Sequence, residues 1–378
     1  MHGNGDKPEG SFPVRLRRLP DTRLWLCSSL NPRQKTNPFA AAFPYFENAP
    51  SIASVKKLGP VAIIGAGLSG LSCAQVLQAA GIGVRVFERA SAVGGRCATQ
   101  LWQGHLVDLG VQYFTAQSGN FKKELLTRLR QFRPIVSPIL DQDNQVVPNA
   151  YGPRFYVLQG NNYFAHVLSQ GLDLRLNSEV KPVAFKSSGI KCLGETYRAV
   201  VSSLPGPQTA QVFGLTESPA EYDPCLVALL EYAGTDLGRA RECYGRLLAN
   251  GDGPLRASYC ENNKVGRVVG NKTVFVVEAT PAYSRKHVEA PSETYLPGLI
   301  GKHEEIWGIP SGQITAAYGH CWTYARPQKD QQRRVELPPG AFICGDSRTG
   351  ATVENVWLDG HKAAQEVLAY LTSKENKK

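Results

Sequence analysis

The residues best suited to chemistry begin with three glycines between an apolar run and a helical one. Gly65, Gly67 and Gly70 follow Val61–Ile64, and a helical stretch continues from about Ser72. In this spacing the first glycine permits a sharp turn, the second lets the backbone approach a pyrophosphate, and the third lets the helix pack closely on a sheet. The pattern predicts a dinucleotide-binding turn. The simpler alternative is a glycine-rich turn without a ligand.

An acidic residue and the start of the helix complete this expected site. Glu88, followed by Arg89, ends the second apolar run, 23 residues after Gly65. A carboxylate at that place can accept hydrogen bonds from the ribose hydroxyls of an adenosine. Leu68 and Ser69, in the turn before the helix, are further candidates for cofactor contact, and the free N–H groups and positive dipole end of the helix N-terminus attract phosphates.

A second glycine element follows soon after the acid. Gly94 and Gly95 precede Arg96, so more N–H groups and a guanidinium are expected near the pyrophosphate. Residues 88–96 resemble the extended FAD fingerprint of the flavin-dependent amine oxidase superfamily. The resemblance implies FAD as the cofactor.

The C-terminal part carries the other half of this resemblance. An apolar run, residues 341–344, ends in Gly345 and Asp346, and a helix is expected from about Val353. In the superfamily such an aspartate contacts the ribityl and phosphate part of FAD, and the helix points its N-terminus at the flavin. The valine after a strand near residues 172–176 meets the adenine through its backbone, which makes Val180 the candidate here.

Four internal segments resemble the renalase-like branch of the superfamily. They match its GAQYFTA, SKPGR, VHATPxWS and HRWRYA elements, and the likeness runs from about residue 58 to 372. The four segments are Gly110–Ala116, Asn263–Arg267, Val276–Ser284 and Gly319–Ala325.

Several positions depart from the branch. Leu109 and Glu278 replace histidines of its pattern, and Cys321 and Thr323 replace arginines. Loss of two cations removes partners for a phosphate-bearing substrate. Glu278 is expected to repel such a substrate and to attract a cationic amine.

The same segments supply the catalytic candidates. Gln112, Tyr113 and Phe114 are expected to wall the flavin, with Trp322 and Tyr324 capping the opposite side of the cavity. The alternative is that these are ordinary aromatic residues of a β core. For Lys264 two interpretations stand: contact with flavin N5 through a water, or a surface loop lysine.

The resemblance implies an α/β fold, with a GR2-type Rossmann FAD-binding domain and an inserted antiparallel-sheet substrate domain. The expected boundaries follow the motifs and the coarse strand and helix pattern, which includes a strand over residues 102–109 and a helix over residues 121–132. They are 1–57 for an N-terminal extension, 58–100, 160–210 and 326–373 for the FAD-binding domain, 101–159 and 211–325 for the substrate domain, and 374–378 for a frayed tail.

Composition excludes several classes of function. The chain has 378 residues and a net charge of +10, but no nucleic-acid motif accompanies its basic runs. No apolar run is long enough to span a membrane. The nine cysteines lack CxxC spacing and the histidines are scattered, so buried free thiols and no metal site are expected. A cytoplasmic location follows from this reading, and the oligomeric state stays open.

The first 58 residues carry nine Lys and Arg against four Asp and Glu, with interleaved prolines. Three explanations compete for this extension. It is a disordered or loosely docked segment, an organelle-targeting peptide, or the upstream misreading of a gene whose start is not a methionine, near Val55.

The expected activity is that of a flavoprotein oxidase. A small substrate gives a hydride to flavin N5, and O2 reoxidises the flavin to hydrogen peroxide. The renalase-like resemblance implies an isomer of NAD(P)H, a dihydronicotinamide, as the donor. The alternatives are an amine or amino-acid oxidase, a flavin-dependent desaturase or isomerase of specialised metabolism, and a catalytically silent FAD-binding protein.

We predict that residues 1–55 are dispensable for FAD binding, because the first nucleotide-binding strand begins only near Pro60. A protein lacking this segment should purify yellow, with about one FAD per chain by absorbance after denaturation. Recovery of colourless or aggregated protein would instead make the apolar patch at residues 38–46 part of the core.

Overall fold

The computed structural model describes residues 60–375 except 130, 236, 239, 241, 249, 250 and 252. The described residues belong to one compact unit, Asn48–Lys378. The N-terminal extension, and with it every expectation about targeting, lies outside the described residues.

A five-stranded parallel sheet forms the nucleotide-binding half, in the order β18-β12-β1-β2-β8. Strands β1 and β12 are buried at every residue, as the central strands of a sheet covered on both faces must be. The strands are β1 (Val61–Ile64), β2 (Val84–Phe87), β8 (Asp173–Arg175), β12 (Ala199–Ser202) and β18 (Ala341–Ile343).

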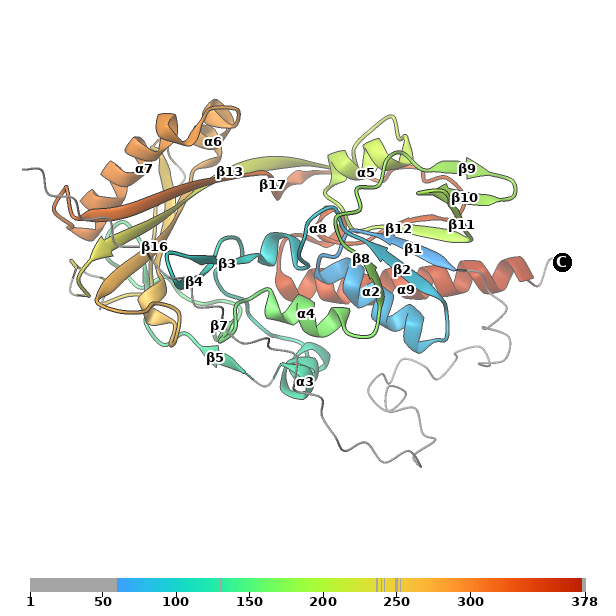
Figure 1. The fold of residues 1–378 in the computed structure, drawn as a ribbon, viewed down its shortest axis with the longest axis horizontal. Coiled ribbons are helices and arrows are strands. Elements are labelled where there is room, and N and C mark those ends of the chain that lie inside the picture. Colours follow the sequence, from blue (N-terminus) through green and yellow to red (C-terminus); the bar gives the residue numbers. More distant parts are fainter. Residues whose placement is uncertain are drawn as a thin grey trace, which may run out of the picture. The chain divides into compact units, whose positions relative to one another are not determined.

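Helices and a small sheet cover the two faces of the parallel sheet (Figure 1). Helices α2 and α9 pack closely on one face: a Cβ added at Gly360 would lie 2.3 Å from the Ser69 carbonyl oxygen. The covering helices are α2 (Leu68–Ala79), α4 (Tyr163–Ser169) and α9 (Val353–Glu375). The other face carries β9 (Ala184–Lys186), β10 (Gly189–Cys192), β11 (Glu195–Tyr197) and α5 (Gly206–Phe213).

A six-stranded sheet in the order β17-β13-β16-β15-β14-β6 forms the other half. Its pairs are antiparallel except β14 with β6. Its strands are β6 (Ile139–Leu140), β13 (Ala220–Ala233), β14 (Gly245–Leu247), β15 (Leu255–Cys260), β16 (Lys272–Ala279) and β17 (Ile314–Gln332). Phe275 and Val277 pack in one core with residues of α7 (Ser292–Trp307), while Val274 and Val276 pack in the core of the opposite face.

Shorter elements lie outside the two large sheets. They are β3 (Thr99–Trp102), β4 (His105–Asp108), α3 (Gly119–Arg128), β5 (Phe132–Pro134), β7 (Phe155–Val157), α6 (Pro281–His287) and α8 (Asp346–Thr349). Two 3₁₀ turns lie at Gly95–Cys97 and Glu261–Asn263.

Several expected boundaries were wrong for local reasons. The strand expected over residues 102–109 is instead part of a hairpin, because Gln103 and Gly104 adopt positive φ and make a tight turn. The helix expected over residues 121–132 ends at Arg128, since Phe132 pairs with Val157 in a strand. Helix α6 was not expected, although Thr280 caps its N-terminus.

The domain boundaries stay a prediction. All five parallel strands lie within the segments assigned to the FAD-binding domain, and β17 continues past residue 325 to Gln332. Within the described ranges, no helix is both long and apolar enough to cross a bilayer, and no group of three His, Cys, Asp or Glu side chains is arranged to hold a metal ion. The eight described cysteines are free thiols, seven of them buried.

One buried histidine yields a pH prediction. His303 of α7 is fully buried, with Nδ1 3.0 Å from the Ser258 hydroxyl and its ring 4.5 Å from that of Phe275. Burial lowers the pKa of His303 to about 3. The unfolded chain therefore binds a proton below about pH 6.5 that the folded protein excludes, so stability falls as the pH drops.

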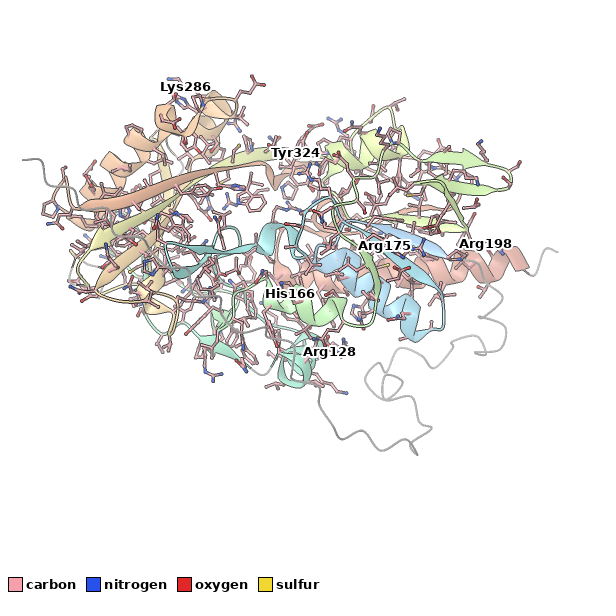
Figure 2. All side chains as sticks on the ribbon, in the orientation of Figure 1. Arg128, His166, Arg175, Arg198, Lys286 and Tyr324 are labelled. Atoms are coloured by element: carbon pink, nitrogen blue, oxygen red, sulfur yellow. The ribbon has the colours of Figure 1, made fainter. Side chains whose placement is uncertain are left out.

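From pH 7 to pH 5 this residue alone should lower the free energy of unfolding by about 2 kcal/mol. In His303→Phe that contribution should vanish, as measured by denaturant unfolding at both pH values. His166→Phe is the control, because His166 is exposed (Figure 2). An identical pH dependence in His303→Phe and the unmodified protein would contradict this account.

Candidate dinucleotide-binding and active site

The three glycines after β1 each occupy a distinct environment. Gly65 has a φ of +98°, which favours glycine. A Cβ added at Gly70 would lie 2.4 Å from the Gly65 carbonyl oxygen, so only glycine allows this approach of α2 to the turn. A Cβ at Gly67 would meet no atom within 4 Å. The protein thus leaves open the place where the sequence predicts the pyrophosphate.

The second glycine element lies against the first. The Gly94 N–H donates to the Ala66 carbonyl oxygen at 2.9 Å, and a Cβ on Gly95 would come within 3.7 Å of the Gly67 Cα. Gly94 and Gly95 both have positive φ. The two glycine motifs therefore form one backbone cradle beside the first turn of α2, where Leu68 and Ser69 are buried.

Arg96 and Asp346, from motifs 250 residues apart, form a bidentate ion pair. The two guanidinium–carboxylate distances are 2.6 and 2.8 Å. Arg96 also donates to the backbone oxygens of Tyr324 and Ala325. The sequence predicted that Arg96 lies near the pyrophosphate, and the family resemblance implied that Asp346 contacts the ribityl and phosphate part of FAD. The structure adds that they hold each other beside β17.

Tyr222 is a member of this site that sequence reasoning missed. Its hydroxyl donates to Asp346 Oδ1 at 2.8 Å, and the Arg96 guanidinium lies over its ring at 5.6 Å. Burial, followed by the nearby Asp346 carboxylate, raises the pKa of Tyr222, so the hydroxyl stays protonated and remains a donor. No sequence motif marks this residue.

Glu88 lies at the end of β2, beside the glycine turn. Its carboxylate accepts from the Ala66 N–H at 2.8 Å and from the Ala90 N–H at 2.9 Å. Arg89, next to it, is exposed. The segment that leads to Val180 runs alongside, since the Ser178 N–H donates to the Glu88 carbonyl oxygen. The expected ribose and adenine contacts are therefore grouped at one end of the sheet.

Helix α9 begins at Val353, as expected, and its first turn holds a loop in place. The Glu354 carboxylate accepts from the N–H groups of Gln117 and Ser118, both at 2.7 Å. These residues follow the predicted flavin wall directly, so the wall is attached to the helix that was expected to face the flavin. Sequence reasoning did not single out Glu354.

The expected wall residues are brought together in part. The Gln112 amide donates to the Gly110 carbonyl oxygen, and its own oxygen is buried with no hydrogen-bond partner among the described residues. Trp322 Nε1 donates to the Leu109 carbonyl oxygen at 3.3 Å, which joins the two motif segments. Phe114 packs against Phe155, with ring centroids 6.1 Å apart.

Two further rings extend the wall. Tyr113 packs edge-on against Tyr244 and Tyr259, at centroid distances of 6.3 and 6.2 Å. Tyr324 instead packs against Tyr222, and its backbone oxygen accepts a hydrogen bond from Arg96.

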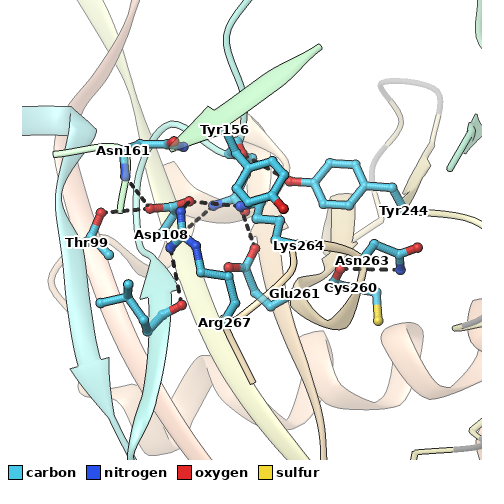
Figure 3. Close-up of polar contacts among 12 residues, drawn as sticks. Thr99, Asp108, Tyr156, Asn161, Tyr244, Cys260, Glu261, Asn263, Lys264 and Arg267 are labelled. Carbon is cyan, nitrogen blue, oxygen red and sulfur yellow. Dashed lines mark hydrogen bonds and ion pairs between the residues drawn. The ribbon is translucent and has the colours of Figure 1, made fainter. Parts of the chain in front are cut away.

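The surface-loop interpretation of Lys264 was wrong. Its side chain is fully buried, with Nζ 2.9 Å from Asp108 Oδ2 and 2.6 Å from Glu261 (Figure 3). Arg267 also pairs with Asp108, at 2.8 Å. Burial acts to raise the pKa of Asp108, but Lys264 and Arg267 together lower it below its ordinary value. The cluster positions its neighbours by paired charges.

The expected attraction of Glu278 for a cationic amine stays a prediction, but the structure pairs its charge. Its carboxylate is buried and its Oε2 accepts from Arg256 at 2.6 Å and from Arg326 at 2.7 Å. Two cations against one anion leave a net positive charge, so Glu278 does not offer an unpaired carboxylate to an amine.

Comparisons with known proteins address the fold and the class. A family model described as an NAD(P)-binding Rossmann-like domain matches residues 63–129. A candidate lysine-specific histone demethylase 1 of Drosophila melanogaster is 32% identical over 158 residues, which are 39% of this chain but only 17% of that protein.

Two solved structures cover much more of the chain. A candidate protoporphyrinogen oxidase from Exiguobacterium has a TM-score of 0.67 at 11% identity, over 82% of this chain and 99% of that one. Putrescine oxidase bound to putrescine has a TM-score of 0.58 at 13% identity, over 82% and 99%. This chain has the flavin amine oxidase fold.

The predicted α/β architecture with a Rossmann dinucleotide-binding half is therefore confirmed. At 11% and 13% identity the solved structures show the fold alone, so the superfamily, the FAD cofactor and the enzymatic activity stay predictions. The comparisons do not single out the renalase-like branch.

The glycine cradle gives a matched pair of predictions. Gly70→Ala should lower the free energy of unfolding of the FAD-free protein by about 1–3 kcal/mol, because the new methyl overlaps backbone. Gly67→Ala should leave that stability no lower, since its methyl enters open space, but should weaken FAD binding about tenfold or more by occupying the place of the pyrophosphate. Denaturant unfolding and FAD titration measure the two effects. Equal stability loss in both variants would contradict this division of roles.

Proposed function

We propose that this protein is an FAD-dependent oxidase of a small molecule. FAD, when bound, accepts a hydride from the substrate and returns two electrons to O2, which becomes hydrogen peroxide. The observation that carries the proposal is the cradle itself. Gly67 leaves a space, Gly95 borders it, and Glu88 lies at the adjacent strand end.

The backbone and side chains of the cradle suit the pyrophosphate and ribityl parts of FAD, and no additional charged residue is needed to bind them. The first turn of α2 and the Gly94–Gly95 backbone present N–H groups to a pyrophosphate. Asp346 is already fixed by Arg96 and Tyr222, so it lies in one defined position. Such fixed donors and acceptors hold a cofactor without reorganisation on binding.

The wall residues orient the substrate and exclude water. Gln112 and Trp322 are held by backbone oxygens, which restricts their rotamers. The His320 imidazole packs on Trp322, with ring centroids 4.5 Å apart, and burial lowers the pKa of His320. It is therefore neutral at physiological pH. Hydride loss from a dihydronicotinamide needs no strong base, since the ring becomes aromatic.

We therefore infer a dihydronicotinamide isomer of NAD(P)H as the donor. The negative charge of Glu278 was expected to repel a phosphate-bearing donor. In the structure the positive charges of Arg256 and Arg326 outweigh it. Amine oxidation is the second candidate, because putrescine oxidase has the same fold. The paired state of Glu278 disfavours a cationic substrate at this position.

We predict that an anaerobic titration with dihydronicotinamide isomers bleaches the flavin absorbance in one fast phase. Admission of air should restore the yellow colour and release about one hydrogen peroxide per donor. Putrescine and neutral amino acids, tested in parallel, should leave the flavin oxidised.

Bleaching by amines alone would replace the dihydronicotinamide proposal with amine oxidation. Bleaching followed by slow reoxidation without peroxide would instead point to a desaturase or isomerase. A tightly bound flavin that no donor bleaches would remove the catalytic proposal altogether.

A further inference from the structure

We propose that Arg256 and Arg326 form a subsite that binds an oxyanion of the substrate, a phosphate or a carboxylate, beside the tyrosines of the flavin wall. The proposal deepens the proposed function and depends on it for the identity of the substrate. It rests on how these two side chains share a single buried partner.

The two arginines have more donors than Glu278 uses. Arg256 donates one hydrogen bond through Nη1 and Arg326 donates one through Nη2, both to the same carboxylate oxygen of Glu278. Each guanidinium carries five N–H donors in a planar fork. The Glu278 side chain is 7% exposed, whereas those of Arg256 and Arg326 are 30% and 36% exposed. The acid is thus covered, and the cations remain accessible.

Glu278 and the two arginines come from three different strands. Glu278 lies on β16 and Arg256 on the adjacent β15, while Arg326 comes from β17 on the far side of β13. Between Arg326 and Glu278 lies β13, where Asp223 pairs with Arg326 and Val227 pairs with Glu278, so the residue midway is the small Cys225. The carboxylate therefore holds two guanidiniums from opposite directions in one place.

This place adjoins the flavin wall. Tyr259 of β15 pairs with Val276 of β16, and Glu278 lies two residues further along β16 on the same face of the sheet, so Glu278 and the two arginines bound to it lie near Tyr259. The Tyr259 ring is 6.2 Å from that of Tyr113. A substrate held against Tyr113 has its charged group within reach of the two arginines.

The surrounding charges leave the site positive. Asp223 pairs along the backbone with Arg326, but its carboxylate is bound by Arg285 at 2.5 Å and by Gln328 at 2.9 Å. Arg154 adds a further cation over the Tyr113 ring, at 5.3 Å. Planar guanidiniums match phosphate and carboxylate geometry, and a cationic substrate would be repelled here.

The test is titration calorimetry of the FAD-loaded protein with inorganic phosphate and, separately, with acetate. Arg256→Gln and Arg326→Gln should each weaken binding about tenfold or more, as expected for loss of hydrogen bonds to a charged group. Glu278→Gln should strengthen it, because both arginines lose their counter-charge. Lys302→Gln is the control, since it removes one positive charge from a surface pair with Glu305 on α7, in the same half, and binding should not change. The tighter of the two probes identifies the oxyanion.

Two results would overturn the subsite: no binding of either anion to the unmodified protein, or equal binding in the variants of Arg256 and Arg326. Retained FAD and an unchanged melting temperature establish that each variant is folded, and Arg326→Lys, which keeps the charge, should retain part of the affinity. Anion binding needs no turnover. If it depends on these arginines while no donor bleaches the flavin, the subsite stands and the proposed oxidase function falls.

Discussion

One buried carboxylate, that of Asp108, ties together the segments that carry the candidate active site. Its Oδ1 accepts from the Thr99 hydroxyl at 2.7 Å and from the Asn161 N–H at 2.9 Å, and its Oδ2 pairs with Lys264 and Arg267 (Figure 3). Three separate stretches are thereby fixed to the end of β4, and the expected flavin wall begins four residues later, at Gln112. Removing one partner from such a buried pair typically costs about 3–5 kcal/mol, because the remaining charge cannot be solvated. The position of the expected wall thus depends on charges that are fully buried.

The nucleotide site depends on a second long-range contact, the pair of Arg96 with Asp346. The strand order explains how residues 250 positions apart meet. Strands β18 and β1 flank β12 in a parallel sheet, so their carboxyl ends lie at the same edge. Gly345 and Asp346 follow β18 there, as the glycine turn follows β1. Ligands of open α/β sheets bind at that edge. Here the residues at the edge come from two segments, one after β1 and β2 and one after β18.

The sequence predicted the elements whose cause is local. A turn that needs positive φ at Gly65 and a close approach at Gly70 is encoded by those glycines themselves, and the start of α9 at Val353 was likewise readable. The sequence did not predict the pairs of residues that only the tertiary fold brings together. Lys264 appeared equally suited to a surface loop, because nothing within its own segment reveals that Asp108 is buried against it. Tyr222 carries no motif at all.

Glu278 shows the same limit for electrostatics. The loss of arginines at positions 321 and 323 suggested a site poor in positive charge, and the sequence alone supports that inference. Yet the sheet order β17-β13-β16-β15 brings Arg326 and Arg256 to the same carboxylate from two other strands. The sign of the charge at this site is therefore a property of strand order and register, not of the motif that contains the acid. A chain can change every charged residue of a motif and keep the field that its substrate meets, provided that neighbouring strands supply the same number of cations.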